Sequence, residues 1–396
     1  MIISIVRLFV SRGSLLTVLA TIILMPVLSA NAQCPRNVLT SGLRTPLGIT
    51  QSNQNNLVVS ESGTSGVLHS GRISIVEADG TRRTLLDGLP SGPNDIGEPS
   101  GPAGVFMRGR TLYVAIGMGD TTLPNQFPNP IPSSPIFSSI LAIHFSASVE
   151  RKTLQGFSLP LSAQQTLASG QKVTLSNADG GKLTVELIAN FPDVTIDPTR
   201  PSGFRNSNPF DLVVVGDQIY VTDGGQNLVR QVDIATGTFS TLATFPNVLN
   251  PLPVGPQGLS VEAVPTGIAY SDGQLLVTLF RGFPFPAGTS VVEQVDPQTG
   301  AHAPFISGLR TAIDVVPLRE GSETHYLVLL HSSAGGAPLP PFFNPGHLLH
   351  FETPAGPSTI VSSCLTRPTS MVVDEKTGLT YVTEVAGRII EIAGGL

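Results

Sequence analysis

Short runs in which hydrophobic and polar residues alternate recur along the whole chain and predict β-strands. The clearest group is "SNPFDLVVVGDQIYVTDGGQNLVRQVDIATG", residues 207–237, where a proline-led run is followed by two more runs and an Asp-x-x-Thr-Gly turn. A period of two residues is the pattern of a strand with one buried face. The segment therefore predicts three consecutive strands.

The proline-led run is repeated six times, which predicts that the whole protein is built from one unit. Each copy is followed by a second and a third alternating run, and most copies by a fourth. The second interval between copies is about twice as long as the others. The copies are "TPLGITQ" from Thr45, "GPAGVFM" from Gly101, "NPFDLVV" from Asn208, "VPTGIAY" from Val264, "TAIDVVP" from Thr311 and "RPTSMVV" from Arg367.

The two ends of the repeat array complement each other. The sixth unit reaches Leu396 without a fourth strand, whereas "NVLTSGL", residues 37–43, matches the runs that end earlier units. We therefore expect an all-β, six-bladed β-propeller whose N-terminal strand completes the last blade. A seventh blade in the long interval is the alternative. Because residues 146–182 contain no proline-led first strand, we interpret them as an insertion between the third and fourth strands of blade two.

The first 32 residues have the order of a secretory signal peptide. Arg7 and Arg12 precede an apolar run over residues 15–28, and Ala30-Asn31-Ala32 follows it. The apolar run is shorter than the ~20 residues that a membrane-spanning helix needs. We predict cleavage after Ala32, a single propeller domain over residues 33–396, and a secreted or periplasmic protein without a membrane anchor.

Three segments carry a resemblance to a known family: "SNPFDLVVVGDQIYVTDGGQNLVRQVD", "EAVPTGIAY" followed by "FRGFPFPAGTSVVEQVDPQTG", and "GLRTAIDVV". They resemble the ScyD/ScyE family of exported proteins, which is associated with cyanobacterial scytonemin-type gene clusters and is related in fold to NHL-like propellers. The similarity covers essentially the whole mature chain. It implies a secreted propeller but no established reaction. The sequence departs from the pattern at Ala312, which replaces the leading proline, and in the insertion of blade two.

Composition and charge narrow the range of partners. The chain has 41 Gly and 34 Pro, a net charge of -6 and no basic run in its mature part. It therefore lacks the electrostatic footprint of a protein that binds nucleic acid or anionic lipid. We expect a monomer whose partner is a small apolar ligand or another protein.

The only two cysteines, Cys34 and Cys364, suggest a disulfide bond in an exported protein. The aligned repeats argue against it. Cys364 falls at the end of a fourth strand, while Cys34 precedes the start of the neighbouring one. Strands in parallel register would hold the two residues much farther apart than the ~6 Å between Cα atoms that a disulfide allows. We expect no bridge unless the N-terminal residues fold back.

One face of the propeller is predicted to hold the functional site. Loops that follow the second and fourth strands gather around the channel mouth on this face. They are long and rich in Pro and Phe, which predicts a stiff apolar rim suited to binding. The alternative is that they only cover the core. The loops are residues 90–100, 117–136, 192–207, 246–263, 281–289 and 332–345.

Polar residues at the strand ends of this face are the candidates for binding, with Glu98 in a loop nearby. Asn208, Asp223 and Glu262 could hold a divalent cation in an alternative function, a metal-dependent hydrolase of the lactonase type. Such residues also cap turns, so no cofactor is expected otherwise. The chain has no motif of zinc, serine-hydrolase or thiol-redox enzymes. The candidates are Asn208, Asp211, Asp223, Glu262, Arg281, His331, which alone is placed as a general base, Arg367 and Glu384.

Overall fold

Six antiparallel sheets follow one another along the chain, and each begins with one of the repeated proline-led runs. The computed structural model describes residues 37–393 except 124, 153, 198–199, 252–259 and 334–343. The predicted six-bladed propeller is confirmed. Its inner strands contact one another in sequence order, and the last contacts the first; they are β2 (Pro46–Gln51), β8 (Pro102–Arg108), β16 (Pro209–Val215), β22 (Pro265–Ser271), β26 (Ala312–Glu320) and β30 (Pro368–Asp374).

The second, third and fourth strands of each blade lie progressively farther from the channel. In blades one to three they are β3 (Leu57–Glu61), β4 (Gly71–Val76) and β5 (Arg82–Leu89); β9 (Thr111–Ile116), β10 (Ser139–Phe145) and β13 (Lys182–Asn190); and β17 (Gln218–Asp223), β18 (Leu228–Asp233) and β19 (Phe239–Thr244). In blades four and five they are β23 (Gln274–Leu279), β24 (Ser290–Val295) and β25 (His302–Leu309); and β27 (Glu323–Leu330), β28 (Gly346–Phe351) and β29 (Ser358–Leu365).

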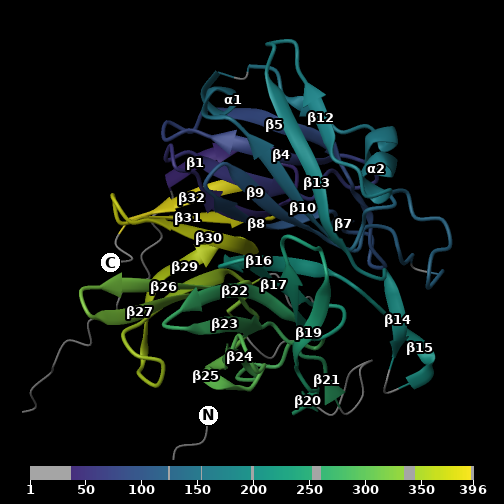
Figure 1. The fold of residues 1–396 in the computed structure, drawn as a ribbon. Helices are drawn as coiled ribbons and strands as arrows, with labels where there is room; N and C mark the ends of the chain where they lie inside the picture. The colour runs from purple at the N-terminus through teal and green to yellow at the C-terminus, as the bar shows by residue number, and fades with distance from the viewer. Residues whose placement is uncertain are drawn as a thin grey trace, which may run out of the picture. The chain divides into compact units, whose positions relative to one another are not determined.

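The two ends of the described chain share blade six. Strand β1 (Asn37–Ser41) pairs antiparallel with β32 (Arg388–Ile392), which lies next to β31 (Leu379–Glu384) and β30. Figure 1 shows the purple N-terminal strand beside the yellow C-terminal strands. The Asn37 side chain also donates a hydrogen bond to Glu391 at 2.8 Å. The predicted ring closure is confirmed.

Blade two carries extra elements between β10 and β13. They are α1 (Ala147–Lys152), β11 (Phe157–Ser158), α2 (Leu161–Ala168) and β12 (Val173–Ser176). Strand β12 adds a fifth strand to blade two, and β11 pairs in parallel with β5 of blade one. Phe157 and Leu167 are buried in the core of these two blades. The insertion therefore covers outer strand edges that would otherwise be exposed.

Three of the loops predicted to be long contain short hairpins. They are formed by β6 (Gly92–Pro93) with β7 (Pro99–Ser100), β14 (Val194–Asp197) with β15 (Arg200–Asn206), and β20 (Val248–Leu249) with β21 (Ser260–Val261). Each hairpin connects the fourth strand of one blade to the inner strand of the next. Within the described part of the chain, no helix has the length and apolar character needed to cross a membrane.

A backbone hydrogen bond recurs at the start of every inner strand. The N–H just beyond the second strand donates to the carbonyl of the residue that precedes the inner strand. In four blades this residue, Thr45, Val264, Thr311 or Arg367, has a φ of 46–51°, which is unfavourable for a residue with a side chain. The surrounding sheet holds this conformation. The six bonds join Ser62 to Thr45, Gly117 to Gly101, Gly224 to Asn208, Phe280 to Val264, His331 to Thr311 and Val385 to Arg367.

Adjacent blades are joined by hydroxyl groups as well as by apolar packing. The hydroxyl of Thr369 donates to the carbonyl of Pro46 at 2.9 Å, which links blade six to blade one. The Thr222 hydroxyl, on the second strand of blade three, donates to the Thr266 carbonyl of blade four at 2.5 Å. Apolar side chains from both faces of each sheet fill the spaces between blades, as at Val58, which is fully buried.

Blades one, three and six contain the same ion pair, between the buried last residue of the second strand and an arginine of the third. Each carboxylate also accepts a backbone N–H from the connection that enters its own blade, so it fixes this connection. A buried charge is tolerated when it is paired and hydrogen-bonded in this way. The pairs are Glu61 with Arg72 at 2.8 Å, Asp223 with Arg230 at 2.9 Å and Glu384 with Arg388 at 2.8 Å.

The expectation that Cys364 is unbridged is wrong, because Cys364 is disulfide-bonded. Cys34, the only other cysteine of the sequence, lies outside the described residues. The expectation assumed that equivalent residues of neighbouring outer strands lie side by side, and they do not. Cys364 on β29 and Val38 at the start of β1 line one small cavity, so the end of one outer strand lies beside the beginning of the next.

We expect that replacing Cys364 with serine lowers the free energy of unfolding by roughly 2–5 kcal/mol, because the bridge restricts the unfolded chain. Urea unfolding of the oxidised protein measures this change. If Cys34 is the partner, Cys34→Ser and the double variant lose the same amount. A Cys34→Ser variant as stable as the wild type would show that the two do not pair.

Removal of residues 35–43 deletes β1 and leaves the edge of β32 unpaired. We expect the shortened protein to melt at a lower temperature and to aggregate through this edge. Both the shortened and the full-length protein should carry Cys364→Ser, so that loss of the disulfide does not contribute to the difference. A shortened protein that remains monomeric and melts at the same temperature would contradict the ring closure.

Candidate functional site

The second residue of every inner strand lines a cavity of about 550 Å³ at the channel mouth. A break in the strand register falls within the first four residues of each inner strand, so each inner strand contains a bulge at the mouth. Bulges re-aim side chains, and here each blade directs one side chain at the cavity. These residues are Leu47, Ala103, Phe210, Thr266, Ile313 and Thr369.

An aromatic cluster from blades four and five forms part of the cavity wall. The Phe280 ring lies 5.8 Å from the Phe285 ring and 5.7 Å from the His331 ring, edge to face in both cases. The blade-four loop is held from two sides, since Arg281 Nε donates to the Thr289 carbonyl at 2.9 Å and Arg310 Nε to the Phe285 carbonyl at 3.0 Å. This loop supplies the stiff apolar rim that its sequence predicts.

Most polar groups at the mouth already have protein partners. Arg367 donates to Glu98 at 2.9 Å, and the Asn208 side-chain oxygen accepts the backbone N–H of Met118 at 3.1 Å. His331 Nδ1–H donates to the Pro368 carbonyl at 2.8 Å. Burial lowers the pKa of His331 to about 4, so this imidazole is neutral at pH 7.

Four of the eight candidate residues line this cavity and four do not. Asn208, Arg281, His331 and Arg367 lie on it, together with Glu98. Asp223 and Glu384, which were expected at the mouth, are instead buried in the ion pairs of blades three and six. Glu262 pairs with Arg205 at 3.7 Å outside the cavity, and Asp211 lies toward the other end of the channel.

The three residues considered for a divalent cation are not arranged as ligands. Both oxygens of Asp223 accept protein hydrogen bonds, from the Asn208 backbone N–H and from Arg230 among others. Asn208 and Glu262 have partners of their own, as given above. Within the described ranges, no three His, Cys, Asp or Glu side chains are grouped so that they could hold a metal ion. The residues present therefore do not fit the cation of the hydrolase hypothesis.

Sequence analysis missed the residues that contribute most to the wall. The predicted site residues were polar residues at strand ends, whereas the cavity surface is supplied by apolar residues such as Leu47, Phe210 and Ile313. The signal was present in the sequence, because each stands directly after the first residue of a repeated inner strand. Only the bulge, which the sequence pattern does not show, turns this position toward the cavity.

The opposite end of the channel holds a second cavity of about 360 Å³, where Asp211 and Asp314 occupy the third position of their inner strands. Asp211 accepts the Ile268 N–H of the next blade at 3.0 Å, and Asp314 accepts the Met371 N–H of the next blade at 2.8 Å. Both carboxylates therefore tie neighbouring inner strands together. A glycine at the equivalent position 104 leaves room for Asp211.

Burial raises the pKa of both carboxyl groups of this second cavity. The pKa of Asp314 is raised to about 6, and that of Asp211 well above its usual range, in the latter case also by the charge of Asp314. None of the described residues that line this cavity is basic, so none opposes the effect. The two groups therefore bind protons more tightly in the folded than in the unfolded protein.

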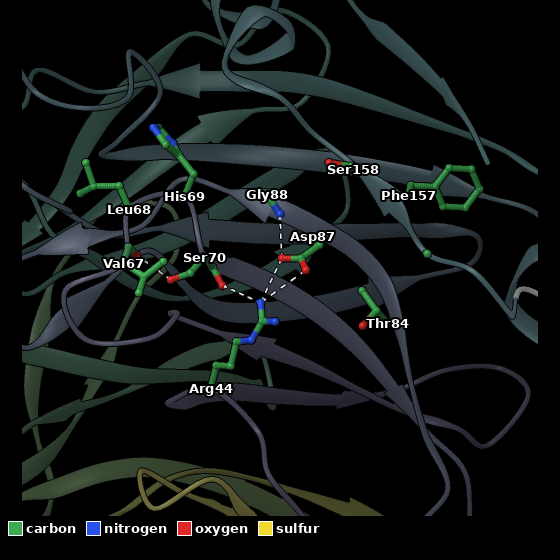
Figure 2. A pocket seen from close by; sticks show the side chains of 11 residues that line it. Arg44, Val67, Leu68, His69, Ser70, Thr84, Asp87, Gly88, Phe157 and Ser158 are labelled. Atoms are coloured by element: carbon green, nitrogen blue, oxygen red, sulfur yellow. Dashed lines mark hydrogen bonds and ion pairs between the residues drawn. The ribbon is translucent and has the colours of Figure 1, made fainter. Parts of the chain in front are cut away.

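A third hollow, of about 580 Å³, lies between blade one and the insertion of blade two (Figure 2). Its basic group, Arg44, is neutralised by Asp87 at 3.2 Å and also approaches the Ser70 carbonyl at 3.5 Å. The exposed Val67 and Leu68 contribute apolar surface. This hollow is wide and open, and its charges are already paired.

Comparisons with known proteins do not add a function. No model of a known protein family matches the sequence, and no curated protein does. Among solved structures, the nidogen–laminin complex is similar with a TM-score of 0.41 and 11% identity, over 83% of this chain and 92% of that one. A protein assigned as a phosphatase from Bacteroides thetaiotaomicron gives 0.48 and 12%, over 89% and 72%. An oxidoreductase assigned as a glucose dehydrogenase from Thermus thermophilus gives 0.45 and 13%, over 90% and 98%.

We expect Asp211 and Asp314 to make the protein less stable as the pH rises. Carboxyl groups with a raised pKa contribute stability that is complete below their unfolded pKa near 4 and is lost as the pH rises through about 6. The variants Asp211→Asn and Asp314→Asn do not titrate. The difference between the melting temperature of each variant and that of the wild type should therefore shift in favour of the variant between pH 5 and pH 8. This improvement is expected even if the variant melts at a lower temperature throughout.

Comparing each variant with the wild type at the same pH removes the contribution of His331, whose lowered pKa acts in the opposite direction. Asp296→Asn is the control, because turn N–H groups of Thr299 and Gln298 lower the pKa of this exposed carboxyl. The control should show no such improvement with rising pH. If the melting temperatures of Asp211→Asn and Asp314→Asn differ from that of the wild type by the same amount at every pH from 5 to 8, the raised pKa values of the two carboxyl groups are contradicted.

Proposed function

We propose that this propeller binds a small, largely apolar molecule in the cavity at its channel mouth. The observation that carries the proposal is the lining of that cavity, where every blade contributes one inner-strand side chain and the Phe280–Phe285 loop adds an aromatic wall. A volume of about 550 Å³ lies in the range of sites for small molecules, which are mostly apolar with a few polar groups that orient the ligand.

The rigidity of the wall supports binding of a ligand over a conformational role. Sheet pairing and interblade hydrogen bonds fix the inner strands, and Arg281 and Arg310 hold the blade-four loop. A site that is already ordered loses little entropy when a ligand enters. A concave cavity also fits a small molecule better than it fits a protein partner, whose surface is flatter.

The metal-dependent hydrolase is the weaker alternative. The side chains of Asp223, Asn208 and Glu262 each form a hydrogen bond or ion pair with another protein group. Among the described residues, no cluster of His, Cys, Asp or Glu side chains could hold a metal ion. His331 has both ring nitrogens in contact with protein groups, Pro368 and Arg367. Nothing in this arrangement favours a general base acting on bound substrate.

The resemblance to the ScyD/ScyE family extends the proposal to where the protein acts. Together with the signal-peptide pattern of residues 1–32, it supports a secreted or periplasmic binding protein that functions as a monomer. The association of that family with scytonemin-type gene clusters suggests that the ligand is a secondary metabolite or one of its precursors.

A matched pair of variants tests the cavity. Ala103→Phe places in blade two the side chain that blade three carries as Phe210, and it should fill part of the mouth cavity. Ala269→Phe makes the same change at the opposite end of the channel, where blade two carries Phe106 at the equivalent position. The neutral fluorescent probe 1-N-phenylnaphthylamine should bind the wild type at one site.

We expect Ala103→Phe to weaken binding of this probe by about tenfold or more, because a buried aromatic ring occupies the space that the probe needs. Ala269→Phe should bind as the wild type does. Fluorescence titration measures both affinities, and circular dichroism checks that both variants are folded. Absence of probe binding to the wild type, or equal losses in the two variants, would overturn the proposal.

A further inference from the structure

Arg281 differs from the other charged residues of the mouth cavity because its charge is not neutralised. Arg281 is 5% exposed and lies on the cavity wall. Nε donates to the Thr289 carbonyl, whereas Nη1 is buried and has no hydrogen-bond partner. Among the described residues, no carboxylate forms an ion pair with this guanidinium. A buried charge in this state is costly unless something pairs with it.

Blade four lacks the ion pair that three other blades contain. In blades one, three and six the last residue of the second strand is a carboxylate that pairs with an arginine of the third strand. Blade four has Leu279 and, opposite it on the third strand, Val291 at these positions. Glu293 acts on Arg281 only at longer range and is itself bonded to His302 at 3.1 Å. Arg281 lies in the loop after the second strand and not on the third strand, where the paired arginines stand, so the repeat supplies no acid for it.

The remaining groups on the wall do not offset this charge. Arg367 is paired with Glu98 at 2.9 Å, and His331 is neutral at pH 7. In the hollow of Figure 2, by contrast, Arg44 is paired with Asp87. The mouth cavity thus combines an apolar, partly aromatic surface with one uncompensated positive charge.

We propose that the ligand is an apolar, aromatic molecule that carries one compact anion, such as a carboxylate, placed against Arg281. An anion would supply the missing partner of the guanidinium, and charge-assisted hydrogen bonds to arginine are among the strongest in proteins. The ring system of the ligand would lie against Phe210, Ile313 and the Phe280–Phe285 wall. This inference rests on the proposed function and adds the chemical class of the ligand.

The test compares 2-naphthoate, which is ionised at pH 7, with 2-naphthamide, a neutral molecule of nearly the same shape. We expect the wild type to bind 2-naphthoate more tightly than 2-naphthamide, by about tenfold or more. Arg281→Met, which keeps the length of the side chain but removes its charge, should bring the two affinities within about twofold. Calorimetric titration measures each affinity.

Arg310→Met is the matched control. Arg310 is buried to the same extent, also has an unpartnered Nη1, and holds the same loop through the Phe285 carbonyl, but it does not line the mouth cavity. Its loss loosens the loop without removing the charge on the cavity wall. The preference for 2-naphthoate should therefore persist in this variant.

Each outcome separates this inference from the proposed function. Equal binding of naphthoate and naphthamide by the wild type overturns the anion while leaving an apolar site in place. Loss of the preference in both arginine variants also overturns it, because the loop and not the charge would then be responsible. If neither compound binds, the inference fails, and the titration with 1-N-phenylnaphthylamine alone decides the proposed function.

Discussion

The antiparallel pairing of β1 with β32 is the interaction on which the ring depends. In each of the other five blades the four repeated strands follow one another along the chain, but blade six needs residues from both ends of the described sequence. Closure also brings β30 against β2, where the Thr369 hydroxyl joins the Pro46 carbonyl. A channel exists only inside a closed ring, so the cavity at its mouth depends on this pairing even though β1 does not line it. The disulfide bond of Cys364, which lies beside the start of β1, reinforces the same region.

The site results from a regular backbone combined with irregular side chains. Each inner strand begins with the same hydrogen bond and the same bulge, so six equivalent positions surround the mouth. The sequence then fills these positions differently, with Phe210 and Ile313 on some blades and Ala103 on another. This variation gives the cavity an asymmetric shape, which a perfectly repeated sequence could not produce. Binding specificity in such a fold therefore comes from departures from the repeat.

Charge follows the same principle. In blades one, three and six a buried carboxylate and arginine neutralise each other and fix the entry to the blade. Ionisable groups outside this pattern stand toward the two ends of the channel: Arg281 lines the mouth cavity, and Asp211 and Asp314, whose pKa values are raised, line the cavity at the other end. The acidic end serves a structural purpose, since both carboxylates hold backbone N–H groups of the next blade.

The sequence by itself determined the number of blades, their strand order and the closure, because these follow from a period-two pattern repeated six times and from two incomplete ends that match. It also indicated the face that carries the long loops, and four of its eight candidate residues lie on the cavity. It did not show that Asp223 and Glu384 turn into their own blades, that a bulge aims Leu47 and its equivalents at the channel, or that Cys364 is bridged. Local patterns report which residues alternate along a strand, whereas these features depend on how separate strands stand relative to one another. Only the packing of neighbouring blades decides that, because contacts between residues far apart in the chain set the direction and the partner of each side chain.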